Sequence, residues 1–228
     1  MNPKSIYVII PCYNDKKMIR QTVKTLMPYG YNIVVVDDGS AENIEEEISD
    51  LPVWFARHRI NLGQGAALQT GTDLALRQGA QFLIHFDSDG QHSAADISSL
   101  LRPLEKGEAD IVIGSRFLNE EDKQAVPGKR RLLLRVARVV NGVLTGIWLT
   151  DAHNGFRALT EKAAKAIRIR ENRMAHASEI LLHIRRKRLR YKECPTHIIY
   201  TEYSQAKGQS AFNSINIVID IIINRLLK

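Results

Sequence analysis

Two aspartates one residue apart are the side chains of this sequence best suited to chemistry. Asp87 and Asp89 follow the apolar stretch 80–84, and Gly90 and Gln91 come next. In an extended segment, side chains two positions apart point the same way, so the two carboxylates would lie close together. Two like charges at that spacing are unfavourable unless a cation or a shared proton lies between them. The stretch therefore predicts paired carboxylates at the end of a strand, with a cation or a proton between them.

Three interpretations of this motif are open. In the first, one or both carboxylates and the Gln91 oxygen bind Mg²⁺ or Mn²⁺, and phosphate oxygens and water fill the remaining positions. In the second, the motif is a loop like that of haloacid-dehalogenase-type phosphatases, although Gln91 stands where such a loop has threonine. In the third, both aspartates cap the following helix, which Gly90 and Ser93 would also favour. The surrounding motifs decide between them.

The first half of the chain alternates β-branched runs with helical patterns, which is typical of βαβ units and a mostly parallel sheet. The sequence predicts strands at 5–10, 32–37, 53–57, 81–86 and 110–114, and helices at 15–27, 41–50, 64–78 and 93–105. Ser40 and Ser93 are the predicted N-caps. The polar clusters PCYND, DDGS, DSDGQH and GSRF each follow a strand. Because ligands bind at the carboxyl ends of parallel strands, these clusters should converge on one site.

After about residue 115 the pattern becomes mainly helical. We predict helices at 129–147, from Thr160, at 175–188 and over 214–228, and a strand at 191–199. The 129–147 helix has a basic face and valines elsewhere. Such a helix can lie on an anionic membrane or bind phosphate, or its basic face can simply be solvated over a core stripe.

Composition narrows the class of protein. The chain has 228 residues, 44% of them hydrophobic and 25% charged, which indicates an ordinary globular protein. The net charge of +7 favours acidic partners such as nucleotides, phosphorylated substrates, nucleic acid or an anionic membrane. Two cysteines without metal-ligand spacing indicate a reduced, cytoplasmic protein. No apolar stretch approaches the roughly 20 residues of a membrane span, so we expect the chain not to cross a bilayer.

Six motifs in order make the chain resemble the family 2 glycosyltransferases of the GT-A fold. They are VIIPCYND, VVVDDGS, NLGQGAALQTG, DSDGQ, GSRF and DAHNGFRAL, and they run from about residue 5 to at least 160. The chain is most similar to the branch that contains polyprenyl-phosphate sugar synthases such as dolichyl-phosphate mannose synthase. The resemblance implies an α/β, Rossmann-like, mostly parallel sheet flanked by helices, with acceptor-side helices toward the C-terminus. It also implies one catalytic domain over 1–228, with a nucleotide-sugar half at 1–115 and an acceptor half at 116–228.

The resemblance assigns one set of residues to the donor and the metal. The residues expected to bind the nucleotide sugar are Pro11, Tyr13, Asp15, Asp38, Gly65, Asp87, Ser88 and Lys207. Those expected at the Mg²⁺ or Mn²⁺ ion are Asp87, Asp89 and Gln91, with Asp87 holding the ribose as an alternative. Asp38 is expected at the base, and its other possible role is to cap the helix after Ser40. His92 receives no role.

A second set is implied for the acceptor and the reaction. Arg116 and Arg131 match positions that contact substrate or acceptor phosphates, and Asp151 and Arg157 match the acceptor side. Arg157 could equally form a buried pair with Asp151. Asp89, Arg116 and Glu179 are the expected catalytic residues, with Glu179 as a base by position. If the acceptor is a polyprenyl phosphate, which is already an anion near pH 7, no base is needed and Glu179 only organises the site.

The implied reaction is an inverting displacement at the anomeric carbon, with UDP or GDP as the leaving group. We expect a polyprenyl-phosphate acceptor and an enzyme attached peripherally to the membrane. The alternative is the same domain acting on a hydroxyl of a lipid-linked saccharide in cell-surface polysaccharide (O-antigen or capsule) synthesis. A nucleic-acid-binding module is the alternative from another class. Because the basic runs 129–138 and 185–190 lack interleaved aromatic residues, we expect no nucleic-acid partner.

Overall fold

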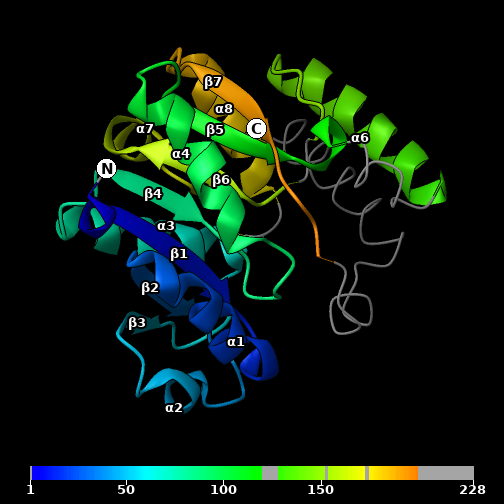
Figure 1. Ribbon diagram of the computed structural model, residues 1–228. Helices are drawn as coiled ribbons and strands as arrows, with labels where there is room; N and C mark the ends of the chain where they lie inside the picture. Colours follow the sequence, from blue (N-terminus) through cyan, green and yellow to red (C-terminus); the bar gives the residue numbers. More distant parts are fainter. Residues whose placement is uncertain (1, 120–127, 152–153, 173–174, 200–228) are drawn as a thin grey trace.

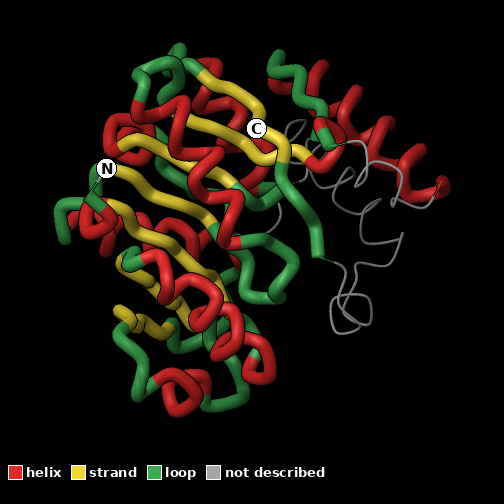
Figure 2. Tube along the Cα trace, viewed as in Figure 1, coloured by secondary structure: helices red, strands yellow, loops and turns green. Residues whose placement is uncertain are grey.

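A seven-stranded sheet with helices on both faces forms the body of the molecule (Figures 1 and 2). The computed structural model describes residues 2–119, 128–151, 154–172 and 175–199. The strands are β1 (Ile6–Cys12), β2 (Asn32–Asp37), β3 (Val53–Arg57), β4 (Phe82–His85), β5 (Ile111–Ser115), β6 (Arg157–Thr160) and β7 (Tyr191–Pro195). The α-helices are α1 (Lys16–Leu26), α2 (Ile44–Ile48), α3 (Gln64–Arg77), α4 (Ile97–Glu105), α6 (Gly128–Thr145), α7 (Glu161–Ala166) and α8 (His176–Arg186). Short 3-10 turns are η1 (Pro3–Ser5), η2 (Met27–Tyr29), η3 (Ala94–Asp96) and η4 (Arg116–Leu118).

The strand order is β3-β2-β1-β4-β6-β5-β7. Strands β1 to β4 pair in parallel, and β5 pairs in parallel with β7, whereas β6 runs antiparallel to both of its neighbours, β4 and β5. The predicted mostly parallel α/β sheet is therefore confirmed. The strand β6 was missed, because its four residues are too few to show a two-residue period.

Two apolar cores lie on opposite faces of the sheet. Helices α1, α2 and α4 pack on one face, and α3, α7 and α8 pack on the other. All seven residues of β1 are buried, as expected for a central parallel strand covered on both faces. Helix α6 lies at the edge of the molecule beside α8 (Figure 1). The described residues include no helix with both the length and the apolar character of a membrane span.

Several predicted boundaries change. Ser40 is not an N-cap, because α2 begins only at Ile44 and Asn43 caps it by accepting the Glu46 N–H. Thr160 is confirmed as the start of a helix, since its hydroxyl accepts the Ala163 N–H at the beginning of α7. The strand expected at 191–199 ends at Pro195. Its remainder runs beside the 91–92 segment, where the Ile199 N–H donates to the Gln91 carbonyl at 2.9 Å. The helix expected at 214–228 lies outside the described residues.

Candidate functional site

The carboxyl ends of β1 and β4 meet through a side-chain hydrogen bond. The Ser88 hydroxyl donates to Asp15 Oδ2 at 2.6 Å, and both residues are buried. Asp15 is the N-cap residue of α1, so the bond joins the start of that helix to the loop after β4. The Thr22 hydroxyl, about two turns further along α1, donates to the Ser88 carbonyl at 2.9 Å. The predicted convergence of the PCYND and DSDGQH clusters is thus confirmed.

The carboxylate of Asp87 is held from two sides. Gln64 Nε2, in the first residue of α3, donates to Asp87 Oδ1 at 2.9 Å. His92 Nε2 lies 2.9 Å from Asp87 Oδ2. Gly155 packs against the same carboxylate so closely that a Cβ there would lie 2.6 Å from Asp87 Oδ2. Segments from α3, the loop after β4 and the chain before β6 therefore surround one acidic side chain.

The two neighbouring carboxylates stand in different electrostatic surroundings. Burial raises the pKa of Asp87, but the hydrogen bond and charge of His92 and the charge of Arg157 outweigh it, so the pKa lies below its ordinary value. Burial and the negative charge of Asp87 raise the pKa of Asp89. Asp89 Oδ1 accepts the Gln91 N–H at 3.0 Å. Asp89 is consequently the carboxylate that a bound cation would stabilise most.

The donor set around Asp89 fits a hard divalent cation. Two carboxylates and the Gln91 amide supply the oxygen ligands that Mg²⁺ and Mn²⁺ prefer. Within the described ranges, no group of three or more His, Cys, Asp or Glu side chains is arranged around a possible ion position. Two carboxylates and one amide oxygen would fill only part of the coordination sphere of such an ion, which leaves positions for phosphate oxygens and water.

Asp38 fixes the turn that leads into α3. Its Oδ1 accepts the Leu62 N–H at 3.0 Å, and its Oδ2 accepts the Gly63 N–H at 2.6 Å. His58 Nδ1 lies 2.7 Å from Asp38 Oδ1. The alternative role of Asp38 as a cap of the helix after Ser40 is wrong, because that helix, α2, begins at Ile44 and is capped by Asn43. Asp38 joins the end of β2 to the glycine turn at the start of α3.

Gly65 allows the segment 170–172 to approach the first turn of α3. The Gly65 N–H donates to the Asn172 carbonyl at 2.7 Å, and a Cβ on Gly65 would lie 2.1 Å from the Glu171 carbonyl oxygen. Glu179 holds the same segment, since its Oε2 accepts the N–H groups of Arg170 and Glu171, each at 2.9 Å. A carboxylate engaged in this way favours the organising role of Glu179 over the role of a base.

Asp151 pairs with Arg116, not with Arg157. Arg116 Nε donates to Asp151 Oδ2 at 2.6 Å, and both side chains are buried. Asp151 Oδ1 is buried and has no hydrogen-bond partner among the described residues. The alternative of a direct Arg157–Asp151 pair is therefore wrong. The GSRF and DAHNGFRAL segments meet through the buried Arg116–Asp151 pair.

Arg157 lies in a buried polar layer beneath the site. It is 3% exposed and stands opposite His85 in the antiparallel pairing of β4 with β6. Burial lowers the pKa of Arg157 to about 10, against the opposing effect of Asp87 and Asp151. Burial, and then the positive charges of Arg157 and His176, lower the pKa of His85 to about 3, so His85 is neutral. Arg157 thus places positive charge under both the Asp87 and the Asp151 carboxylates.

Two residues around Asp87 were missed by the sequence. Gln64 stands within the glycine-rich NLGQG motif, and His92 directly follows Gln91. The only available signal was this proximity to motifs, because the contacts come from segments far apart in the chain.

The remaining predicted residues have simpler placements. Pro11 is buried in β1, and Tyr13 is 44% exposed just beyond it. Arg131 lies in α6, and Lys207 is outside the described residues.

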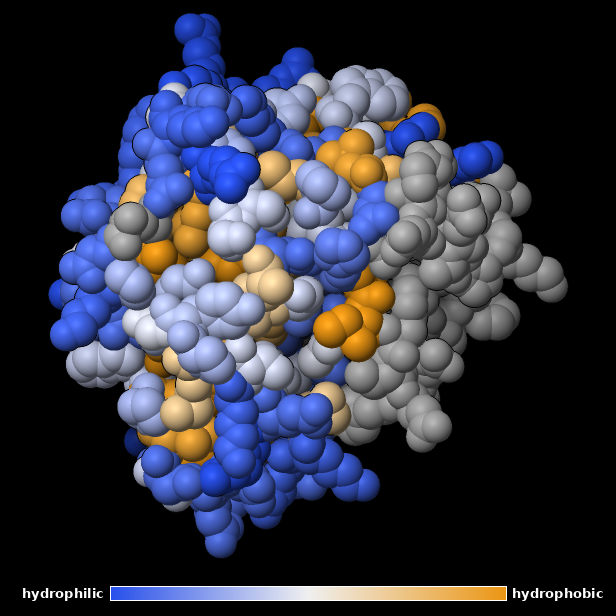
Figure 3. Space-filling model, in the orientation of Figure 1, coloured by the Kyte–Doolittle hydropathy of each residue, from blue (hydrophilic) through white to orange (hydrophobic). Residues whose placement is uncertain are grey.

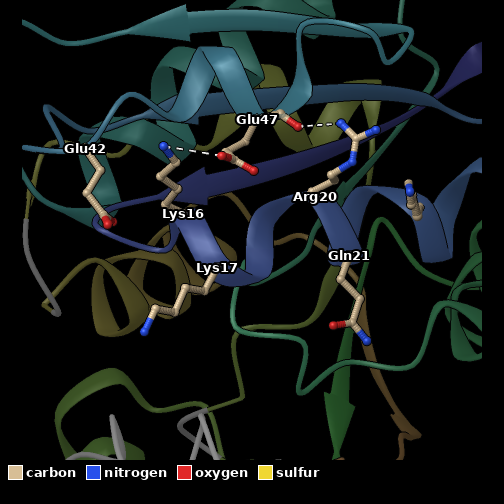
Figure 4. Close-up of a pocket in the computed structure, with 7 residues that line it drawn as sticks. Lys16, Lys17, Arg20, Gln21, Glu42 and Glu47 are labelled. Carbon is tan, nitrogen blue, oxygen red and sulfur yellow. Dashed lines mark hydrogen bonds and ion pairs between the residues drawn. The ribbon is translucent and has the colours of Figure 1, made fainter.

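A separate, open pocket of about 610 Å³ is lined by residues of α1 and α2 and the turn before α2 (Figure 4). The residues lining it are Lys16, Lys17, Arg20, Gln21, Lys24, Glu42 and Glu47. Lys16 pairs with Glu47 at 3.3 Å, and Arg20 pairs with Asp50 at 2.6 Å. The pocket includes none of the residues around Asp87. The residues around Asp87, outside this pocket, form the candidate functional site.

Comparisons with known proteins identify the family of the chain. Residues 7–168 match the family model described as Glycosyl transferase family 2. The UDP-N-acetylglucosamine–dolichyl-phosphate N-acetylglucosaminyltransferase of Methanococcus voltae is 32% identical over 248 residues, which cover 100% of this chain and 99% of that protein. The polyprenol monophosphomannose synthase of Mycolicibacterium smegmatis is 32% identical over 169 residues, covering 70% of this chain and 63% of that protein.

A solved structure confirms the expected GT-A fold. Glucosyl-3-phosphoglycerate synthase from Mycobacterium tuberculosis, in complex with Mn²⁺, UDP and glucosyl-3-phosphoglycerate, superposes with a TM-score of 0.71 at 16% identity. The match covers 96% of this chain and 77% of that one. Because the family model spans most of the chain, and a 32% identical relative is matched over nearly its full length, the chain belongs to glycosyl transferase family 2.

Proposed function

We propose that this glycosyltransferase moves a sugar from a nucleoside diphosphate sugar to a polyprenyl-phosphate-type lipid, with inversion at the anomeric carbon. The observation that carries the proposal is the Asp87–Asp89 pair at the carboxyl edge of the sheet, gathered with the start of α3 and with Asp15. The relative from M. voltae is named for transfer to dolichyl phosphate, and the relative from M. smegmatis for synthesis of polyprenol monophosphomannose, which supports this class of acceptor.

Asp89 and Gln91 are proposed to hold a Mg²⁺ or Mn²⁺ ion, with Asp87 as a further ligand or as the residue that binds the ribose. When bound, such an ion supplies positive charge to the departing diphosphate. The raised pKa of Asp89 supports this assignment, since the protein leaves much of its negative charge uncompensated. The solved structure that contains Mn²⁺ and UDP supports the use of a divalent ion.

The donor nucleotide, UDP or GDP, is proposed to lie against the ends of β1 and β2. The residues proposed to bind it are Pro11, Tyr13, Asp15, Asp38, Gly65, Ser88 and Lys207. The bond between Ser88 and Asp15 orients two of these side chains together. We assign residues 1–115 to the donor half and 116–228 to the acceptor half of one catalytic domain.

The acceptor phosphate is proposed to bind Arg116 and Arg131, on the side of the site that carries Asp151 and Arg157. Asp151 fixes Arg116 by accepting from its Nε, so the guanidinium is oriented before the acceptor arrives. A phosphate monoester is already an anion near neutral pH and needs no base to attack. A reaction without a base agrees with the position of Glu179, because its carboxylate already accepts hydrogen bonds from two backbone N–H groups.

We propose that the enzyme attaches to the cytoplasmic face of a membrane, and the exposed side chains of helix α6 support contact with a lipid surface. Val136, Val139 and Val143 are 50%, 47% and 67% exposed, whereas Asn141 and Thr145 on the same helix are buried. Among the side chains of α6 that the structure describes, three exposed valines on one face suit a lipid surface. The exposed Arg135 adds positive charge for anionic lipids. In Figure 3, apolar patches interrupt a mostly hydrophilic face of the molecule.

A transfer assay tests the proposed function. The enzyme is mixed with UDP- or GDP-linked sugars, Mn²⁺ and a polyprenyl phosphate, and radiolabelled sugar is counted in the organic phase. We expect transfer to the polyprenyl phosphate but not to the matching polyprenol, because only the former brings an anionic nucleophile. Transfer to saccharide hydroxyls with none to polyprenyl phosphate would instead support the polysaccharide alternative and overturn the proposed acceptor.

A further inference from the structure

His92 lies buried beside Asp87 and contacts it through one ring nitrogen. The His92 Nε2 to Asp87 Oδ2 distance is 2.9 Å, and the side chain of His92 is 4% exposed, against 29% for that of Asp87. An ionised carboxylate can only accept a hydrogen bond, so the proton on His92 is assigned to Nε2. The buried imidazole therefore donates to a carboxylate that is itself still accessible to ligands.

Two phenylalanines fix the orientation of the His92 ring. The ring is stacked on Phe156, with centroids 4.8 Å apart and planes at 24°. It meets Phe86 edge to face at 5.5 Å, and Phe86 meets Phe156 in the same manner at 5.4 Å. The His92 backbone is also bridged to Ile198. Because packing and backbone pairing hold the ring, the direction of its N–H is set before any ligand binds.

The other contacts of Asp87 complete a rigid support. Gln64 donates to Asp87 Oδ1, the oxygen that His92 does not contact, and Gly155 packs closely against Oδ2, where a larger side chain would not fit. Without these contacts, repulsion between the Asp87 and Asp89 carboxylates would favour rotamers that separate them. Two hydrogen-bond donors from different segments oppose that rotation.

We infer that His92 is a positioning residue, which holds the Asp87 carboxylate in the orientation that binds a divalent cation together with a nucleoside diphosphate. The inference rests on the proposed function and assigns a role to a side chain that the family resemblance left without one. Residues that hydrogen-bond to metal ligands typically change metal affinity about 10- to 100-fold when removed. The phenylalanine stack further links the position of Asp87 to the segment 154–156 on the acceptor side.

Two substitutions at position 92 separate hydrogen bonding from packing. His92→Phe keeps an aromatic ring against Phe156 but removes the N–H donor. His92→Gln keeps an N–H donor near the position of Nε2 but removes the ring. Gln64→Leu removes the second donor independently, and His197→Phe is a matched control, since the half-exposed His197 contacts Asp96 and not Asp87. Melting temperatures show whether each variant remains folded.

Binding of Mn²⁺ in the presence of UDP is measured by electron paramagnetic resonance of the free ion, and GDP is the parallel probe. We expect about 10- to 100-fold weaker Mn²⁺ binding for His92→Phe, a smaller loss for Gln64→Leu, recovery of most of the affinity in His92→Gln, and no change for His197→Phe. In transfer assays His92→Phe should raise the Mn²⁺ concentration for half-maximal turnover more than it lowers kcat at saturating Mn²⁺.

The outcomes separate this inference from the proposed function. Unchanged Mn²⁺ affinity in folded His92→Phe, with normal binding by the wild type, overturns the role of His92 and leaves the proposed function standing. An equal loss in His92→Gln and His92→Phe also overturns it, because packing would then matter more than the donor. If His92→Phe does not fold, the other two variants decide. Weaker Mn²⁺ binding by Gln64→Leu with near-normal binding by His92→Gln supports the inference. Normal Mn²⁺ binding by Gln64→Leu with weak binding by His92→Gln overturns it. If the wild-type enzyme fails to bind Mn²⁺ both in the presence of UDP and in the presence of GDP, both proposals are overturned.

Discussion

Asp87 and Asp89 are separated by one residue, yet the protein treats their charges differently. Asp87 receives hydrogen bonds from His92 and Gln64, and Arg157 lies in the buried layer below it. Asp89 receives one from the Gln91 backbone, and burial raises its pKa. A carboxylate whose pKa is raised on folding destabilises the fold when it is ionised, so Asp89 is kept at a cost in stability that a bound cation would remove.

Substitution of Asp89 tests this difference. Asp89→Asn should lower Mn²⁺-dependent sugar transfer by at least about 100-fold, because it removes a charged ligand of the proposed cation. Without metal at pH 7, its melting temperature should equal or slightly exceed that of the wild type, since an unfavourable buried charge is gone. Calorimetry with and without Mn²⁺ and UDP checks this, because only the wild type should gain stability from the ligands. Full transfer activity in Asp89→Asn would rule out Asp89 as an essential ligand.

Gly155 tests the packing behind Asp87. A Cβ at this position would lie 2.6 Å from Asp87 Oδ2, so Gly155→Ala should displace the carboxylate and lower transfer about 10-fold or more. Gly79→Ala is the matched control. Its Cβ meets open space, and its φ of +83° costs stability without any contact to the site. We expect Gly79→Ala to lower the melting temperature and leave transfer intact, and the opposite result for the two variants would contradict this role of Gly155.

At the scale of elements, β6 decides how the two halves of the site meet. Running antiparallel between β4 and β5, it brings the 154–156 segment back to the carboxyl end of β4, where Gly155 contacts Asp87. A parallel strand in the same place would put that segment at the opposite edge of the sheet. The reversal of one short strand therefore places an acceptor-side segment against a donor-side carboxylate.

Helix α6 gives a prediction about membrane binding. The double substitution Val139→Ser and Val143→Ser should weaken binding to vesicles of anionic phospholipid by about tenfold. The reason is that the two exposed valine side chains would no longer bury apolar surface in the lipid. The melting temperature should change little, because both side chains are exposed. Ile60→Ser, at a residue that is 66% exposed outside α6, is the matched control. Equal vesicle binding by the double variant and the wild type would show that this face does not contact lipid.

At the scale of the whole molecule, Asp110 ties separate parts of the acceptor half together. Its carboxylate accepts from the side chain and backbone N–H of Arg190, just before β7, and from Lys162 on α7. The hydrogen bonds from Arg190 hold the pKa of Asp110 well below its ordinary value, although burial opposes the shift. A single buried carboxylate therefore fastens β5, α7 and β7 to one another.

The pH dependence of stability follows from the direction of that shift. A depressed carboxyl pKa contributes stability that is present above the unfolded pKa of about 3.9 and is lost as the pH falls toward the folded value. Asp110→Asn should lower the free energy of unfolding by about 1–3 kcal/mol at pH 7, and the gap to the wild type should shrink below about pH 4. Urea unfolding at both pH values measures it. Glu161→Gln, in an exposed pair with Lys165, should change stability by less than about 0.5 kcal/mol, and an Asp110→Asn effect no larger than this control would contradict the role.

The sequence by itself determined the parallel half of the sheet, the order of the motifs and the family. β-branched runs separated by helical patterns specify βαβ units locally, and polar clusters after successive parallel strands must reach the same edge of the sheet. Asp87 and Asp89, two positions apart in the chain, were recognisable as a pair because of this short spacing.

Only the tertiary structure decided which residues support that pair. Gln64, His92 and Gly155 reach Asp87 from three segments. Asp151 pairs with Arg116, whereas the sequence left open a pair with Arg157, and Glu179 holds a neighbouring backbone segment. None of these contacts leaves a periodic pattern in the sequence, because each depends on how strands and helices pack over long separations. Local physics specifies the elements, whereas the orientation of each functional side chain is set by neighbours that only the folded chain brings together.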